Sequence, residues 1–348
     1  MGGIIPPFFT LAEIWPTCLK VNSLKKILFL SKGHDASSTR YRALQFFDRF
    51  AKAGFCPCHK TVSGRVGNYI AALLGAREAD YVIVLRKTFP PLYLWLLRKV
   101  SRRLLFDFDD AIFCNTDGSP SATRMSRFAA ITSIADHIFA GNRFLAAHAK
   151  EFNPAVSVVP TSIDPANYNA RPEKPIDFID LVWIGSGSTR KYLMDALPWL
   201  ALAAKHIPNL RLKIIADFDI SGGGVTTLPI PWSKDREADD LASSHIGIAP
   251  MRDDDWSRGK CALKVLQYMA AGLPVISSAA GVNAEVLEDG ACGYLASSPQ
   301  EWVDRLVKLT GDSSLRRTLG DAGRLRVETA YSNSAAFSLM FDVLEELR

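Results

Sequence analysis

The sequence has few cysteines and no long uninterrupted apolar run. Six cysteines in 348 residues are too sparse for a disulfide framework, and a reduced cytosolic setting fits this usage. Charged residues interrupt the apolar stretches before they reach the roughly 18–20 residues that a spanning helix needs. Hydrophobic residues make up 48% and charged residues 22%, which excludes disordered, collagen-like and low-complexity chains. At roughly 100–200 residues per domain, this length favours two domains.

Several motifs that define catalytic classes are also missing. The sequence has no P-loop, no G-x-S-x-G elbow and no G-x-G-x-x-G in a strand-to-helix context. Cys56 and Cys58 do not form a C-x-x-C pair, and no second pair exists, so we do not expect zinc. Long Lys/Arg runs and interleaved aromatic–glycine motifs are absent as well. We therefore do not expect nucleic acid as a partner.

The first 24 residues are apolar but contain three prolines and a glutamate. No basic segment precedes the apolar part and no clear small-residue cleavage site follows it, so we do not interpret this leader as a signal peptide. Two interpretations stay open. In the first, the leader is disordered or results from a start codon assigned too early. In the second, it is a shallow anchor at a membrane surface.

Charge is distributed unevenly along the chain. Residues 1–165 carry 21 Lys and Arg against 12 Asp and Glu, whereas residues 166–348 carry 20 against 24. The net charge of +5 therefore conceals a basic first half and a mildly acidic second half. A basic half is suited to phosphates or to an anionic membrane surface.

Short apolar runs alternate with helical patterns, and this alternation predicts parallel sheets covered on both faces. The predicted strands are 26–30, 81–85, 104–108, 137–140, 157–159, 181–184, 210–216, 246–249, 274–277 and 293–296. The predicted helices include 40–53, 91–103, 125–135, 191–205, 262–271 and 299–309. Residues 161–177 contain three prolines and no apolar periodicity, which indicates a linker between two such series.

The predicted fold is therefore α/β, with two Rossmann-like parallel-sheet lobes facing across a cleft. We place the N-terminal lobe at residues 25–165 and the C-terminal lobe at residues 166–332. Residues 333–348 form a final helix that we expect to pack back towards the N-terminal lobe. Ligands of such sheets bind beyond the carboxyl ends of the strands.

The strongest candidate site lies in residues 258–295. Lys264 and Gln267 share one face near the start of a predicted helix, and Lys260 lies one turn earlier. Two lysines, Gly259 and a helix N-terminus suit a pyrophosphate group, and the Gln267 amide suits a ribose. A surface helix with solvated polar residues would show the same spacing, so both interpretations stay open.

A second candidate follows the predicted strand 181–184. Gly185, Ser186 and Gly187 form a turn in which the backbone can approach a ligand closely, and Arg190 can reach a phosphate. Such a turn is also an ordinary way to leave a strand.

Two further candidates follow predicted strands of the N-terminal lobe. Asp109 and Asp110 come directly after strand 104–108. Carboxylates at this position suit a general base, contacts to sugar hydroxyls or a metal, and a solvated turn would show the same residues. His34, Arg40 and Arg42 follow strand 26–30; arginine suits phosphate or carboxylate, and histidine is an acid or base by type. A surface histidine without a catalytic role is equally consistent with the sequence.

Residues 260–295 resemble the donor-binding segment of bacterial family 4 glycosyltransferases, which have the GT-B fold. The segment is similar to a branch with a K-x-x-Q/E-Y-M-A motif, here Lys264–Ala270. Glycine and glutamine stand at positions 259 and 267, where the wider family has glutamates. The strings VWIGSGSTRKYL, DWSRGK, FDFDDAIF and AGNRFLAAHA also resemble that branch, and the resemblance runs from about residue 26 to residue 331.

The resemblance implies a retaining transfer of a sugar from a nucleotide-sugar donor to an acceptor hydroxyl, with no cofactor and no required metal. Lys264 would hold the donor diphosphate, with Lys260 or Arg190 assisting, and Gln267 would meet the ribose. Asp109 or Asp110 would orient or deprotonate the acceptor, and Glu285 would touch the donor. The alternatives are a GT-B epimerase, an inverting transferase or a non-catalytic nucleotide-sugar-binding protein.

Residues 89–103, FPPLYLWLLRKVSRR, combine an apolar surface with four basic residues. A basic amphipathic helix at an anionic membrane has this composition, and so does a core-packed helix with a basic outer face. Under the membrane interpretation of this helix, we expect a cytoplasmic enzyme that is peripheral to the inner face of the plasma membrane. Its acceptor would be a sugar or a lipid-linked glycan in cell-surface polysaccharide biosynthesis.

Overall fold

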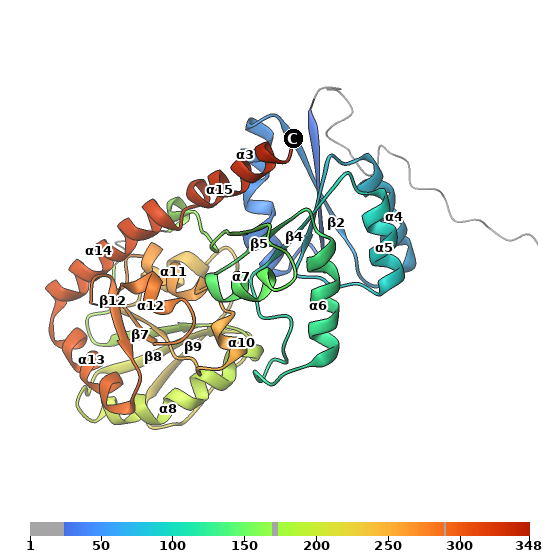
Figure 1. Ribbon diagram of the computed structural model, residues 1–348. Coiled ribbons are helices and arrows are strands. Elements are labelled where there is room, and N and C mark those ends of the chain that lie inside the picture. Colours follow the sequence, from blue (N-terminus) through green and yellow to red (C-terminus); the bar gives the residue numbers. More distant parts are fainter. Residues whose placement is uncertain (1–23, 169–172, 289) are drawn as a thin grey trace, which may run out of the picture. The chain divides into compact units, whose positions relative to one another are not determined.

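The computed structural model describes residues 24–168, 173–288 and 290–348 (Figure 1). The predicted leader lies outside these residues apart from its last position. The described chain divides into two compact units. The first comprises the residues up to Val159 together with Phe337–Arg348, and the second comprises those of Pro160–Ala336.

The first unit is built on a six-stranded sheet with the order β2-β1-β3-β4-β5-β6, and all of its strand pairs are parallel. Its strands are β1 (Lys25–Ser31), β2 (Phe55–Thr61), β3 (Tyr81–Leu85), β4 (Arg103–Phe108), β5 (His137–Ala140) and β6 (Val156–Val158). Its helices are α2 (Ser37–Arg42), α3 (Phe47–Lys52), α4 (Val66–Glu78), α5 (Pro91–Val100), α6 (Ala122–Ile134), α7 (Arg143–Lys150), the short η1 (Leu44–Phe46) and most of α15 (Asn333–Glu346). The apolar side chains of β3 are buried throughout, as expected of a strand covered on both faces.

Aromatic side chains pack the C-terminal helix onto the first unit. Phe337 and Phe341 of α15 lie 5.0 Å and 6.1 Å, centroid to centroid, from Phe50 and Phe55 respectively. The Tyr81 hydroxyl also donates a 2.8 Å hydrogen bond to the Leu344 carbonyl. The end of the chain thus returns to the sheet with which the described chain begins.

The second unit contains another six-stranded sheet, with the order β12-β11-β10-β7-β8-β9 and parallel pairs throughout. Its strands are β7 (Ile179–Ile184), β8 (Leu210–Ala216), β9 (Thr226–Pro231), β10 (Ile246–Ala249), β11 (Val275–Ser278) and β12 (Gly293–Ala296). Its helices are η2 (Pro165–Asn167), η3 (Gly187–Thr189), α8 (Arg190–Ala204), α9 (Glu237–Ala242), α10 (Asp255–Arg258), α11 (Leu263–Ala270), α12 (Asn283–Leu287), α13 (Pro299–Gly311) and α14 (Ser313–Ala330). Trp183 and Trp302 are the largest side chains of its buried core.

The two parallel sheets confirm the predicted α/β class and the two Rossmann-like lobes. Within the described ranges, none of the helices combines the length and hydrophobicity that crossing a bilayer requires. Among the described residues, Cys58, Cys114, Cys261 and Cys292 form no disulfide.

Candidate functional site

The predicted donor residues gather at one edge of the second sheet. Because its strands are parallel, the turns that follow β7, β10 and β11 lie at the same edge, and α8, α11 and α12 begin there. The turn after β7 contains Gly185, Ser186 and Gly187, and Lys264 lies in the first turn of α11. A helix N-terminus carries unpaired N–H groups and partial positive charge, so this edge suits an anion.

The turn after β7 requires a glycine at its first position. A Cβ atom on Gly185 would lie 2.3 Å from the Cη2 atom of Trp183 and 2.6 Å from Oγ1 of Thr189. Ser186 and Thr189 cap the following helix reciprocally, since the Ser186 N–H donates to Thr189 Oγ1 over 3.3 Å. Ser186 and Gly187 are exposed. Their backbone is therefore open to a ligand above the buried indole.

Trp183 connects this turn to the predicted lysine. The Nζ atom of Lys264 lies 4.5 Å from the centre of the Trp183 ring, which is fully buried. The cation therefore rests on the aromatic face, an arrangement stabilised by the ring quadrupole. Burial, and after it the charge of Lys260, lowers the pKa of Lys264 to about 7. An ammonium with so low a pKa gains strongly from an anionic ligand.

Arg190 belongs to the same group through one more aromatic ring. Phe218, which follows β8, lies 5.9 Å from Trp183 by ring centroids, and the Arg190 guanidinium is 5.2 Å from the Phe218 ring. Lys260 rests in turn 4.4 Å from the ring of Trp256. Three of the predicted cations thus lie against aromatic faces at this edge of the second sheet.

Gln267 is placed differently from our expectation. It is buried, with 4% of its surface exposed, and does not share an open face with Lys264. Its Nε2 donates to Oε1 of Glu237 over 2.7 Å, and Oε2 of Glu237 accepts from the Trp232 indole over 2.7 Å. Helix α9, which carries Glu237, packs on this side of α11 and supplies the partner that a buried amide needs.

Glu285 is exposed in the first turn of α12, after the turn that follows β11. The carbonyl oxygen of Glu285 accepts a 2.7 Å hydrogen bond from Arg326 of α14, which fixes the backbone of this turn. Its side chain remains at the surface.

In the first unit, Asp109 and Asp110 lie beside an arginine that sequence reasoning missed. Arg86 follows β3 and pairs with Oδ1 of Asp109 at 3.4 Å and with Oδ2 of Asp110. Asp110 is only 6% exposed, and Asp109 is partly exposed. Arg86 has a left-handed backbone (φ 49°), and its N–H donates to the Asp107 carbonyl over 2.8 Å. The signal for Arg86 was its position directly after a buried strand.

Arg42 does not lie where we expected. We expected it on the acceptor side, but its guanidinium is buried and binds both carboxylate oxygens of Asp107 at 2.9 Å and 2.7 Å. It also donates to the Val159 carbonyl over 2.7 Å. Asp107 is fully buried and does not face a ligand beside Asp109. The pair joins α2 to β4, and we assign Arg42 to the internal framework of the unit.

The two remaining predicted residues lie near the end of β1. His34 is exposed, with Nδ1 3.3 Å from Asp35, and the Arg40 guanidinium lies 5.0 Å from the Tyr41 ring. The His34 ring is 5.7 Å from that of His59, whose Nε2 is 2.8 Å from Ser31 Oγ. Burial, and then the charges of His34 and Lys60, lower the pKa of His59 to about 4. His59 was not predicted, because its strand was not.

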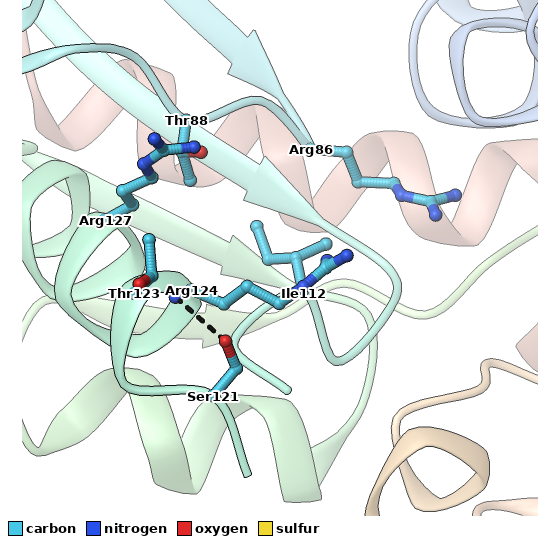
Figure 2. Close-up of a pocket in the computed structure, with 7 residues that line it drawn as sticks. All are labelled: Arg86, Thr88, Ile112, Ser121, Thr123, Arg124 and Arg127. Carbon is cyan, nitrogen blue, oxygen red and sulfur yellow. Dashed lines mark hydrogen bonds between the residues drawn. The ribbon is translucent and has the colours of Figure 1, made fainter. Parts of the chain in front are cut away.

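A pocket of about 420 Å³ lies in the first unit (Figure 2). It is lined by residues that follow β3 and β4 and by the start of α6. These residues are Arg86, Thr88, Ile112, Ser121, Thr123, Arg124 and Arg127. None of them was singled out from the sequence. Among the residues that the structure describes, no group of three or more His, Cys, Asp or Glu side chains is arranged to hold a metal.

Part of the chain is similar in sequence to a known protein family. Residues 180–312, which carry the turn after β7, Lys264 and Glu285, match the family described as glycosyl transferases group 1. The spore coat protein SA of Bacillus subtilis is 34% identical over 85 residues, which are 24% of this chain and 22% of that protein. The chain thus matches about a fifth of that relative's length.

Solved structures match almost the whole chain. Sucrose-phosphate synthase from Thermosynechococcus elongatus has a TM-score of 0.72 and 15% identity, covering 93% of this chain and 99% of that one. Anabaena HepE, in complex with UDP and glucose, has a TM-score of 0.69 and 14% identity over 93% and 99%. Identities this low show the fold alone. The chain therefore has the GT-B fold, and its residues 180–312 match the family described as glycosyl transferases group 1.

Proposed function

We propose that the protein is a retaining glycosyltransferase that moves a sugar from a nucleotide-sugar donor to an acceptor hydroxyl. The observation that carries this proposal is Lys264, held on the Trp183 ring beside the Gly185 turn within the glycosyl transferases group 1 domain. HepE, a structural relative, is seen with UDP and glucose, which supports a donor of this kind.

Glycosyl transfer requires positive charge near the leaving group. When the glycosidic bond to the donor breaks, a nucleoside diphosphate leaves with its charge increased. Lys264, the N-terminus of α11 and the Gly185 turn supply an ammonium and N–H donors at one edge of the sheet, and Arg190 adds a second cation. We propose that these groups stabilise the leaving diphosphate without a metal ion, and that Lys260 acts on the same phosphates.

Acceptor activation belongs to the first unit in this proposal. Asp109 and Asp110 follow β4, at the edge of the first sheet where ligands of such folds bind. Asp109, the more exposed of the two, orients the acceptor hydroxyl or takes its proton, and Arg86 positions both carboxylates. His34 and Arg40 lie after the end of β1, which β3 separates from β4 in the sheet, and they contact the acceptor beyond its reacting hydroxyl.

We also propose that the enzyme acts at the cytoplasmic face of a membrane, on a sugar or lipid-linked glycan of cell-surface polysaccharide. Helix α5 packs inward through Leu94 and Leu97 and leaves Leu92 and Trp95 71% and 57% exposed. The exposed Lys99 lies one turn after Trp95. Apolar side chains beside a lysine at the surface suit an anionic bilayer.

The test of the transferase proposal is nucleotide release from a panel of nucleotide sugars in the presence of EDTA, with and without candidate sugar acceptors. We expect slow donor hydrolysis by the wild-type chain and a loss of about 10²–10³-fold in Lys264→Ala, as for removal of a charge-stabilising group. Lys205→Ala is the matched control, because Lys205 is exposed at the far end of α8. Near-wild-type release by Lys264→Ala would contradict the site, and donor binding without any release would favour a non-catalytic binder.

A further inference from the structure

The pocket of the first unit is lined by cations and hydroxyl groups and by no carboxylate. Figure 2 shows Arg127 reaching towards Thr88 and Arg124 lying beside Ile112, whereas Arg86 points away from both. The Arg86 guanidinium is already engaged by Asp109 and Asp110. The charge that the pocket can offer to a ligand therefore comes from Arg124 and Arg127.

These two arginines differ from four other arginines of their unit. Arg42, Arg86, Arg98 and Arg102 each pair with an aspartate. For the exposed side chains of Arg124 and Arg127, no carboxylate partner is found in the part of the chain that the structure describes. Two positive charges thus remain at one wall of the pocket without internal compensation.

Their place on α6 makes an anionic ligand more favourable still. Ser121 caps the helix by accepting the Arg124 N–H, so both arginines lie in the first two turns, and the first turn has no acidic residue. Cations near a helix N-terminus oppose the macrodipole, and like charges three residues apart repel each other. An anion in the pocket would relieve both effects. It would also meet the Thr88 and Thr123 hydroxyls.

The pocket is larger than an inorganic anion requires. At about 420 Å³ it falls within the range of small-molecule sites, whereas one water occupies only about 30 Å³ in the liquid. It lies directly after β4, next to the carboxylates to which we assign the acceptor.

We propose that this pocket binds the anionic group, a phosphate or a carboxylate, of the acceptor, so that the acceptor is a phosphorylated or acidic sugar. The acceptor role of the bound group rests on the proposed function. The binding of an anion in the pocket does not depend on it. Arg124 and Arg127 are the specificity-determining residues, because a planar guanidinium binds two oxygens of such a group at once.

The test is a titration of the full chain with inorganic phosphate, glucose 6-phosphate, glucuronate and glucose. Binding is monitored by NMR through the Nε resonances of the arginines. We expect the anionic probes, and not glucose, to shift the signals of Arg124 and Arg127. Arg124→Gln/Arg127→Gln should weaken that binding at least tenfold. Arg65→Gln/Arg77→Gln is the matched control, because it removes two exposed arginines from the ends of α4 in the same unit.

Binding by the double variant equal to that of the wild type, or equal weakening in the control, would overturn the pocket as an anion site. The acceptor role has its own measurement, namely whether a probe that binds accelerates nucleotide release from the donor. Acceleration lost in Arg124→Gln/Arg127→Gln supports the inference. If an anion binds at the pocket while no nucleotide binds the protein, the acceptor assignment falls together with the proposed function and the anion site remains. A response to the phosphorylated probe or to glucuronate identifies which anionic group is recognised.

Discussion

Lys264 is a cation held against an aromatic face and close to a second lysine. Its pKa of about 7 results first from burial and then from the charge of Lys260. The unfolded chain keeps an ordinary lysine pKa near 10.4 and so binds more protons than the folded chain above pH 7. The contribution of Lys264 to stability therefore rises with pH from about 7 to about 10. A bound diphosphate raises the pKa of Lys264, because it stabilises the charged amine.

Nucleotide binding should consequently take up a proton. At pH 8 the free protein carries mostly neutral Lys264, and a bound nucleoside diphosphate recharges it. We expect calorimetry between pH 7.5 and 8.5, in buffers of different ionisation enthalpy, to show uptake of close to one proton and affinity falling by up to about tenfold per pH unit.

Lys264→Arg provides the control for this pH dependence, since an arginine remains charged throughout that range. Its affinity should be nearly flat with pH, with no proton uptake. Wild-type binding without proton uptake at pH 8 would show that Lys264 does not face the phosphates.

The sequence indicated where a residue lies when its contacts are local. The Gly185 turn and Lys264 belong to short motifs at a strand end and a helix start, and the structure brings them together through Trp183. Gln267 and Arg42 were misplaced because their partners, Glu237 and Asp107, lie 30 and 65 residues away in the sequence. A long-range pairing of buried polar groups leaves no local pattern.

At the scale of secondary structure elements, Tyr268 fixes α11 against two strands. Its hydroxyl accepts from the Ile184 N–H over 3.0 Å and donates to the Ile248 carbonyl over 3.2 Å. It thereby ties α11 to the ends of β7 and β10, between the Gly185 turn and Lys264. Burial raises the pKa of this tyrosine, so the hydroxyl remains protonated and able to donate at ordinary pH.

Tyr268→Phe should lower the free energy of unfolding by about 1–3 kcal/mol, because a buried backbone N–H would lose its acceptor. Tyr294→Phe is the matched control: Tyr294 is also buried, and its hydroxyl forms no hydrogen bond among the described residues. Urea denaturation followed by circular dichroism measures both. Equal stability of the two variants would contradict this role for Tyr268.

Helices α4 and α5 carry the proposed membrane surface. They pack together through Tyr69 and Tyr93, whose ring centroids are 5.2 Å apart. Besides the exposed residues of α5, helix α4 shows an apolar stripe at four-residue spacing. This stripe consists of Val66, Ile70 and Leu74, exposed by 74%, 51% and 41%.

Leu92→Ser/Trp95→Ser should reduce co-sedimentation with anionic liposomes at low salt by severalfold, because two apolar side chains no longer enter the bilayer. Leu325→Ser tests for a general effect of surface hydrophobicity, since Leu325 is 60% exposed on α14. If neither the wild type nor the control binds such liposomes, the membrane proposal is wrong.

Two whole strands were missed from the sequence, and both lie at sheet edges. Strand β2 contains Pro57 and polar residues, and β9 contains two prolines. Edge strands tolerate proline and need no continuous apolar run, so the pattern that revealed the central strands is absent from them. The helix predicted at 40–53 is also divided into α2, η1 and α3.

At the scale of the whole molecule, each unit has one sheet and one set of candidate residues at the carboxyl edge of that sheet. Alternation of strands and helices along the chain sufficed to predict this architecture, because buried parallel strands are nearly uniform apolar runs. The fold is shared at only 14–15% identity with sucrose-phosphate synthase and HepE. The pocket of the first unit was not predictable, because three separate segments form it.

The proposed function depends above all on the binding of a nucleotide-sugar donor to the second unit through Lys264, at the start of α11. Calorimetric titration of the full chain with a panel of nucleoside diphosphates and their sugar conjugates, with EDTA present, tests it most directly. We expect saturable binding of one nucleotide at pH 7.5, lost in Lys264→Ala and retained in Lys205→Ala. A folded protein that binds none of them, or a Lys264→Ala variant that binds as tightly as the wild type, would contradict it.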